Sequence, residues 1–413
     1  MRALLLGAGA SFDAGMPLVT ELTAELRRWF TADKLARFNS GWRAKGGGWS
    51  DGPVSTLLAL LQNGSMHYEQ IIGAIEVEFA REPDVRQRQD LHAMNGFLLQ
   101  AVRGLLLERQ IKNLTFALSV LDDFAAIQKL ADENKPLWMF STNHDVIIEL
   151  LAAKFSIPVK SGFKEKVTIG MDSGQGEAVD VNFERLSRAA ITARDYDFFR
   201  PGEAGINLIK LHGSLDIFGQ GDDLNYLKVA SKDGSARSYV DQLQSLEAVD
   251  LALGRNHGVR ANNEHVYLDA QGETQFLRNS LLSGANKFSP RMSQIAPPEF
   301  LSLFRGSLNY ASELVSIGYG FGDQHINEPV VDWLSQARPR QLTIVNPGIS
   351  RCPDRFGHLC AQVSLVPEGA REYFLNIGDG KSGAARYVIR KLQTANRKRR
   401  MEELLARGDT QRK

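Results

Sequence analysis

Two short polar segments carry the residues best suited to chemistry. Asn143 lies in the segment STNHD, which follows the apolar run Leu137 to Phe140, and His212 opens the segment HGS after the run Ile206 to Leu211. An asparagine side chain offers both a hydrogen-bond donor and an acceptor, which suits ribose hydroxyls or a water molecule. A histidine titrates near neutral pH and can accept a proton. Asn143 and His212 are therefore the candidate catalytic residues.

Each of these residues also has a structural explanation. Asn143 and Asp145 could cap a following helix, and His212 could be a hydrogen-bonded core histidine. Taken singly, neither explanation is favoured over the other. Both segments, however, follow apolar runs that are expected to be buried strands, and packing does not explain polar side chains at such strand ends. In open parallel sheets that is where ligands bind.

A glycine-rich turn, GAGAS at residues 7–11, follows the apolar run Ala3 to Leu6 and precedes a helical pattern from Leu18 to Phe30. Glycines let a backbone approach a pyrophosphate, and free amides at a helix start donate hydrogen bonds to it. The spacing departs from GxGxxG because the third glycine is missing. A plain glycine turn before a helix is the alternative.

Five apolar runs, each followed by a turn or a polar motif, alternate with helical patterns: residues 3–6, 137–140, 206–211, 314–317 and 342–345. Such alternation is typical of a parallel sheet that helices cover on both faces. The expected fold class is α/β, with a Rossmann-like sheet and a mostly helical inserted domain. The insertion is expected where apolar residues recur at spacings of three and four without a strand between them.

The expected organisation has six segments. Residues 1–50 begin the Rossmann-like domain and 51–134 form the helical insertion. Residues 135–218 continue the sheet, 219–295 are a variable insertion or cap, and 296–380 complete the sheet. Residues 381–413 form a basic C-terminal helix and tail with eleven Lys/Arg against three Asp/Glu. Within the first segment, residues 36–52 are rich in Gly and Trp and are expected to form a loop.

Composition narrows the class of protein. Of the 413 residues, 43% are hydrophobic and 23% are charged, as in soluble globular proteins, and the net charge of +1 creates no field that would attract nucleic acid. No apolar stretch reaches the roughly 18 residues of a membrane span. The two cysteines, Cys352 and Cys360, are too few for a disulfide framework or a four-thiolate zinc site. A cytoplasmic protein without direct nucleic-acid or membrane binding is expected.

The order of the motifs GAGAS, GMP, STNHD, KLHGS, GYGFGD and VNPG resembles that of the sirtuin-like superfamily. The resemblance implies a Rossmann-type sheet that binds NAD as a substrate, and no metal is expected. It assigns a phosphate loop, a segment at the nicotinamide ribose, a catalytic histidine, a later phosphate contact and an adenosine-ribose contact. In that order the matching residues are Gly7, Ala8, Gly9 and Ser11; Asn143 and Asp145; His212; Gly318 and Tyr319; and Asn346.

The departures from that family bear on the activity. Deacylating sirtuins carry two CxxC pairs on a zinc module, whereas this sequence has only two cysteines. The overall form resembles the bacterial sirtuin-like NAD hydrolases of antiphage defence, most of all the subunit paired with a HerA-type ATPase. This resemblance implies a regulated NAD glycohydrolase that forms a homo-oligomer. The alternatives are an NAD-dependent protein deacylase and a non-enzymatic sensor of NAD or ADP-ribose-like ligands.

One further motif, Asp323-Gln324-His325, has the spacing of a metal pair. Two ligands without a third are weak evidence for a metal. We therefore expect Asp323 and His325 to position a loop.

Overall fold

The computed structural model describes residues 1–221, 225–258, 261–284, 297–378, 388, 391–397 and 399. The chain forms two compact units. Unit 1 comprises Met1–Met16, Leu106–Leu281 and Ile295–Gly380, and unit 2 comprises Pro17–Leu105, Leu282–Gln294 and Lys381–Lys413. These bounds differ from the expected segments, because the helical part already begins at residue 17 and residues 106–134 belong with the sheet.

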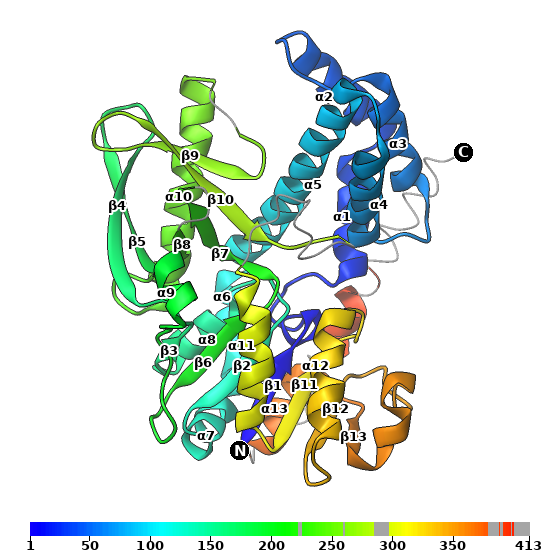
Figure 1. Ribbon diagram of the computed structural model, residues 1–413, viewed down its shortest axis with the longest axis vertical. Coiled ribbons are helices and arrows are strands. Elements are labelled where there is room, and N and C mark those ends of the chain that lie inside the picture. Colours follow the sequence, from blue (N-terminus) through cyan, green and yellow to red (C-terminus); the bar gives the residue numbers. More distant parts are fainter. Residues whose placement is uncertain are drawn as a thin grey trace. The chain divides into compact units, whose positions relative to one another are not determined.

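Unit 1 contains a seven-stranded sheet in the order β13-β12-β11-β1-β2-β6-β3 (Figure 1). All of its strand pairs are parallel. The strands are β1 (Arg2–Leu6), β2 (Leu137–Ser141), β3 (Val159–Lys160), β6 (Ile206–Lys210), β11 (Glu313–Ile317), β12 (Gln341–Val345) and β13 (Val363–Val366). The five predicted strands are confirmed, and the α/β fold class with them, whereas β3 and β13 were not predicted.

Helices cover this sheet because both of its faces are apolar. Leu5 and Phe140 lie in one hydrophobic cluster with residues of α11 (Glu299–Ser307) and α12 (Gln324–Ser335), and the Phe140 ring lies 4.8 Å from that of Phe304. Figure 1 shows α11 and α12 in front of the strands. The remaining helices of the sheet region are α6 (Leu114–Leu121), α7 (Ala126–Glu133), α8 (Ile147–Lys154) and α13 (Ala370–Ile377).

The strand order reverses beside β1. From β1 the chain continues to β2 and β6 on one side and returns through β11, β12 and β13 on the other. The crevice outside the carboxyl ends of two such diverging strands is the usual ligand site of a doubly wound sheet. The glycine loop after β1 and Gly318 after β11 therefore flank the switch point.

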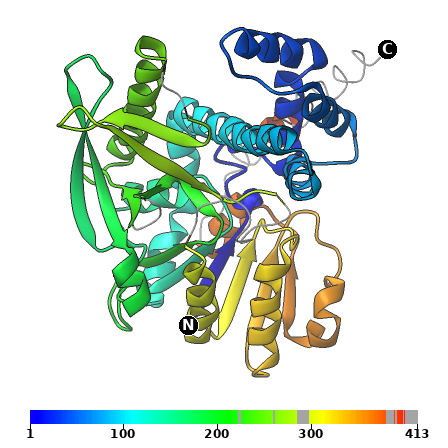
Figure 2. The same cartoon turned by 45° about the horizontal axis from the view of Figure 1, so that its top comes forward.

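A closed six-stranded barrel in the order β10-β7-β8-β5-β4-β9 also belongs to unit 1, and its long strands curve beside α10 in Figure 2. Its elements are β4 (Glu165–Asp172), β5 (Ala178–Ser187), α9 (Arg188–Ala193), β7 (Gly213–Gln220), β8 (Asn225–Val229), α10 (Ala236–Asn256), β9 (Glu264–Leu268) and β10 (Thr274–Leu281). Sequence analysis expected continued sheet up to residue 218 and a variable cap after it. The barrel was missed because strands such as β4 are short of buried residues and lack clear alternation.

Unit 2 contains α1 (Val19–Trp29), α2 (Ala32–Arg43), α3 (Asp51–Gln62), α4 (Tyr68–Arg81) and the first part of α5 (Val85–Lys112). The helix predicted from Leu18 to Phe30 is confirmed as α1. The loop predicted for residues 36–52 is wrong over its first half, because α2 extends to Arg43. Trp42 at the end of α2 packs edge-on against Trp49 and Phe97, with ring centres 5.1 and 5.3 Å away. Aromatic packing thus overrides the low helix propensity of this segment.

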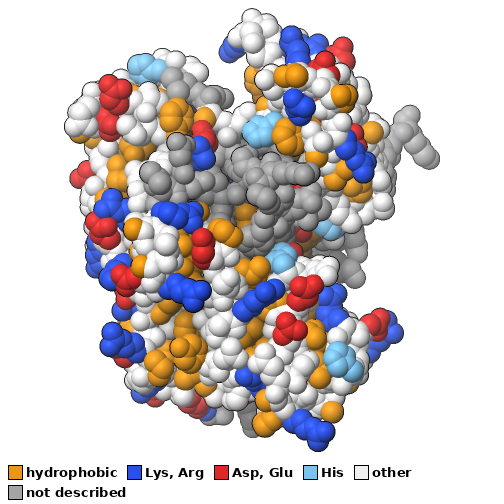
Figure 3. Space-filling model, viewed as in Figure 1, with side chains coloured by type: hydrophobic (Ala, Val, Ile, Leu, Met, Phe, Trp, Pro, Cys, Tyr) orange, Lys and Arg blue, Asp and Glu red, His pale blue; other side chains and the backbone are white. Residues whose placement is uncertain are grey.

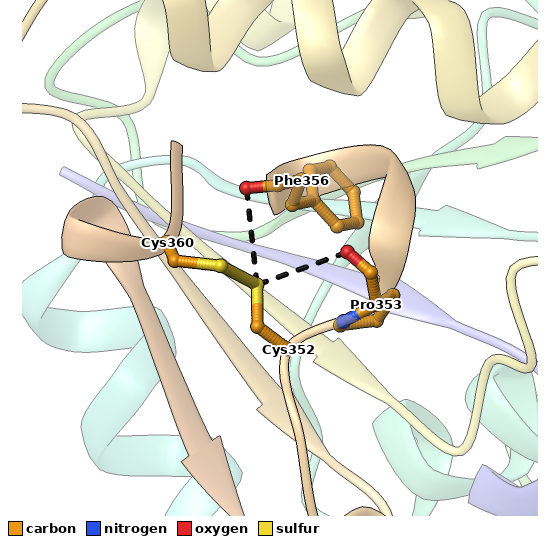
Figure 4. Close-up of a disulfide and its surroundings, with 4 residues drawn as sticks. All are labelled: Cys352, Pro353, Phe356 and Cys360. Carbon is orange, nitrogen blue, oxygen red and sulfur yellow. Dashed lines mark hydrogen bonds between the residues drawn. A yellow bond between two sulfur atoms is a disulfide. The ribbon is translucent and has the colours of Figure 1, made fainter. Parts of the chain in front are cut away.

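Cys352 and Cys360 form a disulfide, and the Cys352 sulfur lies 3.8 Å from the carbonyl oxygens of both Pro353 and Phe356 (Figure 4). Sequence analysis did not predict this bond. Disulfides are rare in reducing compartments, so this bond does not support the predicted cytoplasmic location, which stays a prediction. None of the helices in the described residues is long and apolar enough to cross a membrane. The predicted basic helix and tail, residues 381–413, lie outside the described residues except for 388, 391–397 and 399.

Candidate functional site

Asn143 joins two of the predicted motifs. It follows β2, and its Nδ2 donates hydrogen bonds to the Gly7 carbonyl oxygen at 2.9 Å and to Ser11 Oγ at 3.1 Å. Its side chain is 7% exposed, and no hydrogen bond to its Oδ1 is found within the described part of the chain. Because both bonds use the amide nitrogen, the acceptor oxygen stays available for a ribose hydroxyl or a water molecule.

The glycine loop is built by close packing as well as by hydrogen bonds. A Cβ on Gly9 would lie 2.7 Å from the Gly318 Cα, and Gly318 itself adopts a φ of +62°. The Gly7 amide donates to the Ile317 carbonyl and the Gly9 amide to the Gly318 carbonyl. These glycines are therefore required where the loops after β1 and β11 meet.

This arrangement corrects one expectation about phosphate binding. Residues 8–10 form only a three-residue 3-10 turn, and the next α-helix, α1, begins at Val19. The amides of Gly7, Gly9 and Ala10 already donate to backbone carbonyls. Of the backbone amides from Gly7 to Ala10, that of Ala8 has no acceptor among the described residues. The loop thus offers a phosphate one such amide rather than the open start of an α-helix.

Asp145 performs the capping role that sequence analysis left open. Its Oδ1 accepts a hydrogen bond from the Ile147 amide, the first residue of α8, at 3.1 Å. Burial raises the pKa of the Asp145 carboxyl, while Lys210, the Ile147 amide and the Ser11 hydroxyl offset part of the rise. The Lys210 ammonium also donates to the Asp145 carbonyl oxygen. Asp145 therefore holds the loop that carries Asn143, and a contact with NAD stays a prediction.

His212 follows β6 and is only 2% exposed. Its Nε2 lies 2.8 Å from the Nε2 of His325, and 4.0 Å from Oδ1 of Asp323. One of the two rings must carry the proton of this hydrogen bond while the other accepts it. The pairing also explains how a histidine at this depth is satisfied.

Tyr319 holds the segment that leads from β11 to His325, the second residue of α12. The Tyr319 hydroxyl lies 3.2 Å from both the Asp323 carbonyl oxygen and Asn327 Oδ1, and Asn327 Nδ2 donates to the Phe321 carbonyl at 3.0 Å. The side chain of Tyr319 is 4% exposed and belongs to the hydrophobic core. Tyr319 thus positions this segment, and it also packs against the glycine loop, since a Cβ on Gly7 would lie 2.5 Å from the Tyr319 Cα and 2.8 Å from the Tyr319 Cβ.

Asn346 lies at the end of the next strand, β12. Its Oδ1 accepts a hydrogen bond from the Gly348 amide at 2.9 Å, and its side chain is half-buried. Asn346 thus forms the turn after β12, at the carboxyl edge of the sheet that also carries Asn143, His212 and Gly318.

His212, Asp323 and His325 each offer one ligand atom, and these atoms lie within 4.8 Å of one another. The structure thus supplies the third group that the sequence spacing lacked. Two nitrogens on one tetrahedral zinc ion, each about 2.05 Å from it, would be about 3.3 Å apart. The observed 2.8 Å is instead a hydrogen-bond distance. We therefore assign the contact as a histidine pair, and the absence of a metal stays a prediction.

Sequence analysis treated His325 as scaffold and did not consider Lys210. His325 carried a weak signal, the histidine of the Asp-x-His spacing. Lys210 carried a clearer one, since a lysine at the end of an otherwise apolar strand needs a buried partner.

No family model and no curated protein matches the sequence. Among solved structures, a Sir2 homolog in complex with NAD is similar at 14% identity and a TM-score of 0.41, covering 91% of this chain and 87% of that one. A Sir2 homologue mutant in complex with ADP-ribose has 13% sequence identity and a TM-score of 0.37, and the match covers 91% of this chain and 89% of that one. Sir2Tm bound to a propionylated peptide has 11% sequence identity and a TM-score of 0.35, and the match covers 92% of this chain and 94% of that one. Likeness at this level carries no inference about activity, which has to come from the chain's own residues.

Proposed function

We propose that this chain hydrolyses NAD to nicotinamide and ADP-ribose. The observation that carries the proposal is the position of Asn143, whose amide bonds the loop after β1 at the switch point of the sheet. His212 follows the next strand along the sheet and is paired with His325. Two polar side chains with these partners, at the usual ligand edge of the fold, support chemistry on a nucleotide.

The chemistry needs orientation and proton transfer more than a strong nucleophile. As nicotinamide leaves, positive charge develops at the anomeric carbon of the ribose, and water attacks that carbon and loses a proton. Asn143 Oδ1 is the acceptor that would orient the water or a ribose hydroxyl. His212 would take the proton, and His325 would share it through the Nε2 contact.

The loops after β1, β2 and β11 offer a nucleotide some of the hydrogen-bonding groups that it needs. The Ala8 amide and the Asn143 acceptor are available, while the packed glycines 7, 9 and 318 let the loops approach closely. Gly7, Gly9, Ser11, Asp145, Gly318, Tyr319 and Asn346 would shape the site rather than supply most of its donors.

Hydrolysis is favoured over deacylation by the cysteines. The two cysteines of the given sequence are eight positions apart and joined in one disulfide, so these residues contain no CxxC pair. The test is to incubate the purified protein with NAD and to follow nicotinamide by chromatography, with and without an acyl-lysine peptide. We expect equal release in both reactions. Release that depends on the peptide would replace this proposal with a deacylase.

The resemblance to antiphage proteins further supports a cytoplasmic, regulated NAD-depleting effector that forms a homo-oligomer and pairs with a HerA-type ATPase. On the face drawn in Figure 3, Lys and Arg are interspersed with Asp and Glu, and the net charge of +1 supports the proposal that the protein does not bind nucleic acid directly. Light scattering and the same assay with the neighbouring gene product test this part. A monomer that is fully active alone would contradict it.

A further inference from the structure

A cavity of about 460 Å³ lies in unit 1, and none of the candidate site residues lines it. Its walls come from α8, from the strands β3, β4, β5 and β8, and from the start of α10. Ligand pockets for small molecules range from about 300 to 1,000 Å³, so a nucleotide-sized molecule would fit.

The lining has three chemically different parts. Apolar side chains form one wall, including Ala153, Ile157 and Val167. Two exposed lysines, Lys166 and Lys232, line the cavity where it meets solvent. This combination suits a ligand with a flat or apolar body and an anionic end.

A network of buried charges forms another part of the lining. Lys228, 4% exposed, donates to Glu149 Oε1 at 2.9 Å and also to Asp216. The Tyr239 hydroxyl contacts the Lys228 ammonium at 3.0 Å. Burial opposes the charge of Lys228, yet Asp216 and Glu149 raise the pKa of its ammonium well above the usual value. All three donors of the Lys228 ammonium therefore bind groups within the protein.

Glu149 has one carboxylate oxygen without a hydrogen-bond donor among the described residues. It is 6% exposed, and its Oε2 accepts no hydrogen bond from the described residues, although Lys210 Nζ lies 3.5 Å away. A buried carboxylate oxygen without a hydrogen-bond donor is unfavourable. Glu149 also lines the cavity, so a ligand that brings an amino or hydroxyl donor would meet this residue there.

The same network leads to the candidate active site. Lys210 lies between Glu149 and Asp145, since its ammonium donates to the Asp145 carbonyl oxygen. Asp145 in turn caps α8, the helix that carries Glu149. A change in the partner of Glu149 therefore reaches the loop of Asn143 through two contacts.

We propose that this cavity binds a nucleoside monophosphate, with its phosphate at Lys166 and Lys232 and a base or ribose donor at Glu149, and that binding slows the reaction at the Asn143 loop. The binding part is independent of the proposed NAD hydrolysis. The regulatory part rests on it.

Calorimetry with AMP tests the binding. We expect a single site in the wild-type protein, and a Kd raised about tenfold by Lys166→Ala or Lys232→Ala, the loss of one charge-assisted hydrogen bond. Lys164→Ala is the matched control, because Lys164 pairs with Asp195 outside the cavity lining and should leave the Kd unchanged. Ala153→Phe should fill the cavity and abolish binding while circular dichroism stays native.

Steady-state kinetics test the regulation and separate the two sites. AMP should lower kcat at saturating NAD at least twofold, and Ala153→Phe should remove that effect. If AMP only raises KM for NAD, or binds Ala153→Phe as tightly as the wild type, it occupies the NAD site and the proposal is wrong. If the protein does not cleave NAD, calorimetry with the lysine variants still decides whether the cavity binds the nucleotide.

Discussion

The histidine pair offers the sharpest test of the proposed chemistry. His325→Ala removes the ring nitrogen that lies 2.8 Å from His212 Nε2, and His212 itself is 2% exposed. A hydrogen bond to a charged group contributes about 1.5–3 kcal/mol, and His212 becomes charged as it takes the proton. At about 1.4 kcal/mol for each factor of ten, kcat should fall about 10- to 100-fold. KM should change little, because the lost contact is made between two protein groups.

The assay is nicotinamide release at saturating NAD, with circular dichroism to confirm the fold. His325→Gln keeps a polar group at this position and should recover part of the loss. The double variant His212→Ala/His325→Ala should resemble His212→Ala, since the two residues act on one proton transfer. His358→Ala, an exposed histidine of the same unit, is the matched control and should behave as wild type.

Two patterns of results would refute this reasoning. If His325→Ala kept wild-type kcat while His212→Ala lost activity, the contact would be structural and His212 would act alone. If His325→Ala or Asp323→Ala lost activity while His212→Ala kept it, the catalytic role would have to move to the Asp-x-His segment.

Three more variants test the site and its support. Asn143→Ala should lower kcat about 10²–10⁴-fold while circular dichroism shows a native fold, and normal turnover would remove Asn143 from catalysis. Gly318→Ala places a Cβ 2.3 Å from the Ala10 amide nitrogen at a φ of +62°, so urea unfolding should show a loss above about 1 kcal/mol. Lys228→Met leaves Asp216 buried without its cation and should cost about 3–5 kcal/mol; a change under 1 kcal/mol would show that the ion pair is dispensable.

Acid should also destabilise unit 1 through Asp216. Burial works to raise the pKa of this carboxyl, yet Lys228 and Lys210 hold it below its usual range. A depressed pKa adds stability above the carboxyl's unfolded value of about 3.9, and that stability is lost as the pH falls below it. Urea titrations at pH 6 and pH 3 should show a smaller loss for Asp216→Asn than for wild type, and equal losses would assign the acid sensitivity elsewhere.

The sequence determined the central strands of the sheet. Leu137 to Phe140 and Ile206 to Leu211 were predicted from their apolar runs and correspond to β2 and β6. Central parallel strands are buried on both faces, so their signal is local and continuous. The position of Asn143 and His212 at strand ends followed from the same runs.

The tertiary structure alone decided the partners of those residues. His212 and His325 are 113 positions apart, and they meet because β6 and α12 are brought to the same edge of the sheet. The Gly9 amide, which the sequence offered to a phosphate, is used instead by the Gly318 carbonyl. Apolar runs and periodicity are encoded within a few neighbouring residues, whereas these contacts depend on strand order and on the close packing of loops from distant segments, which no local pattern contains.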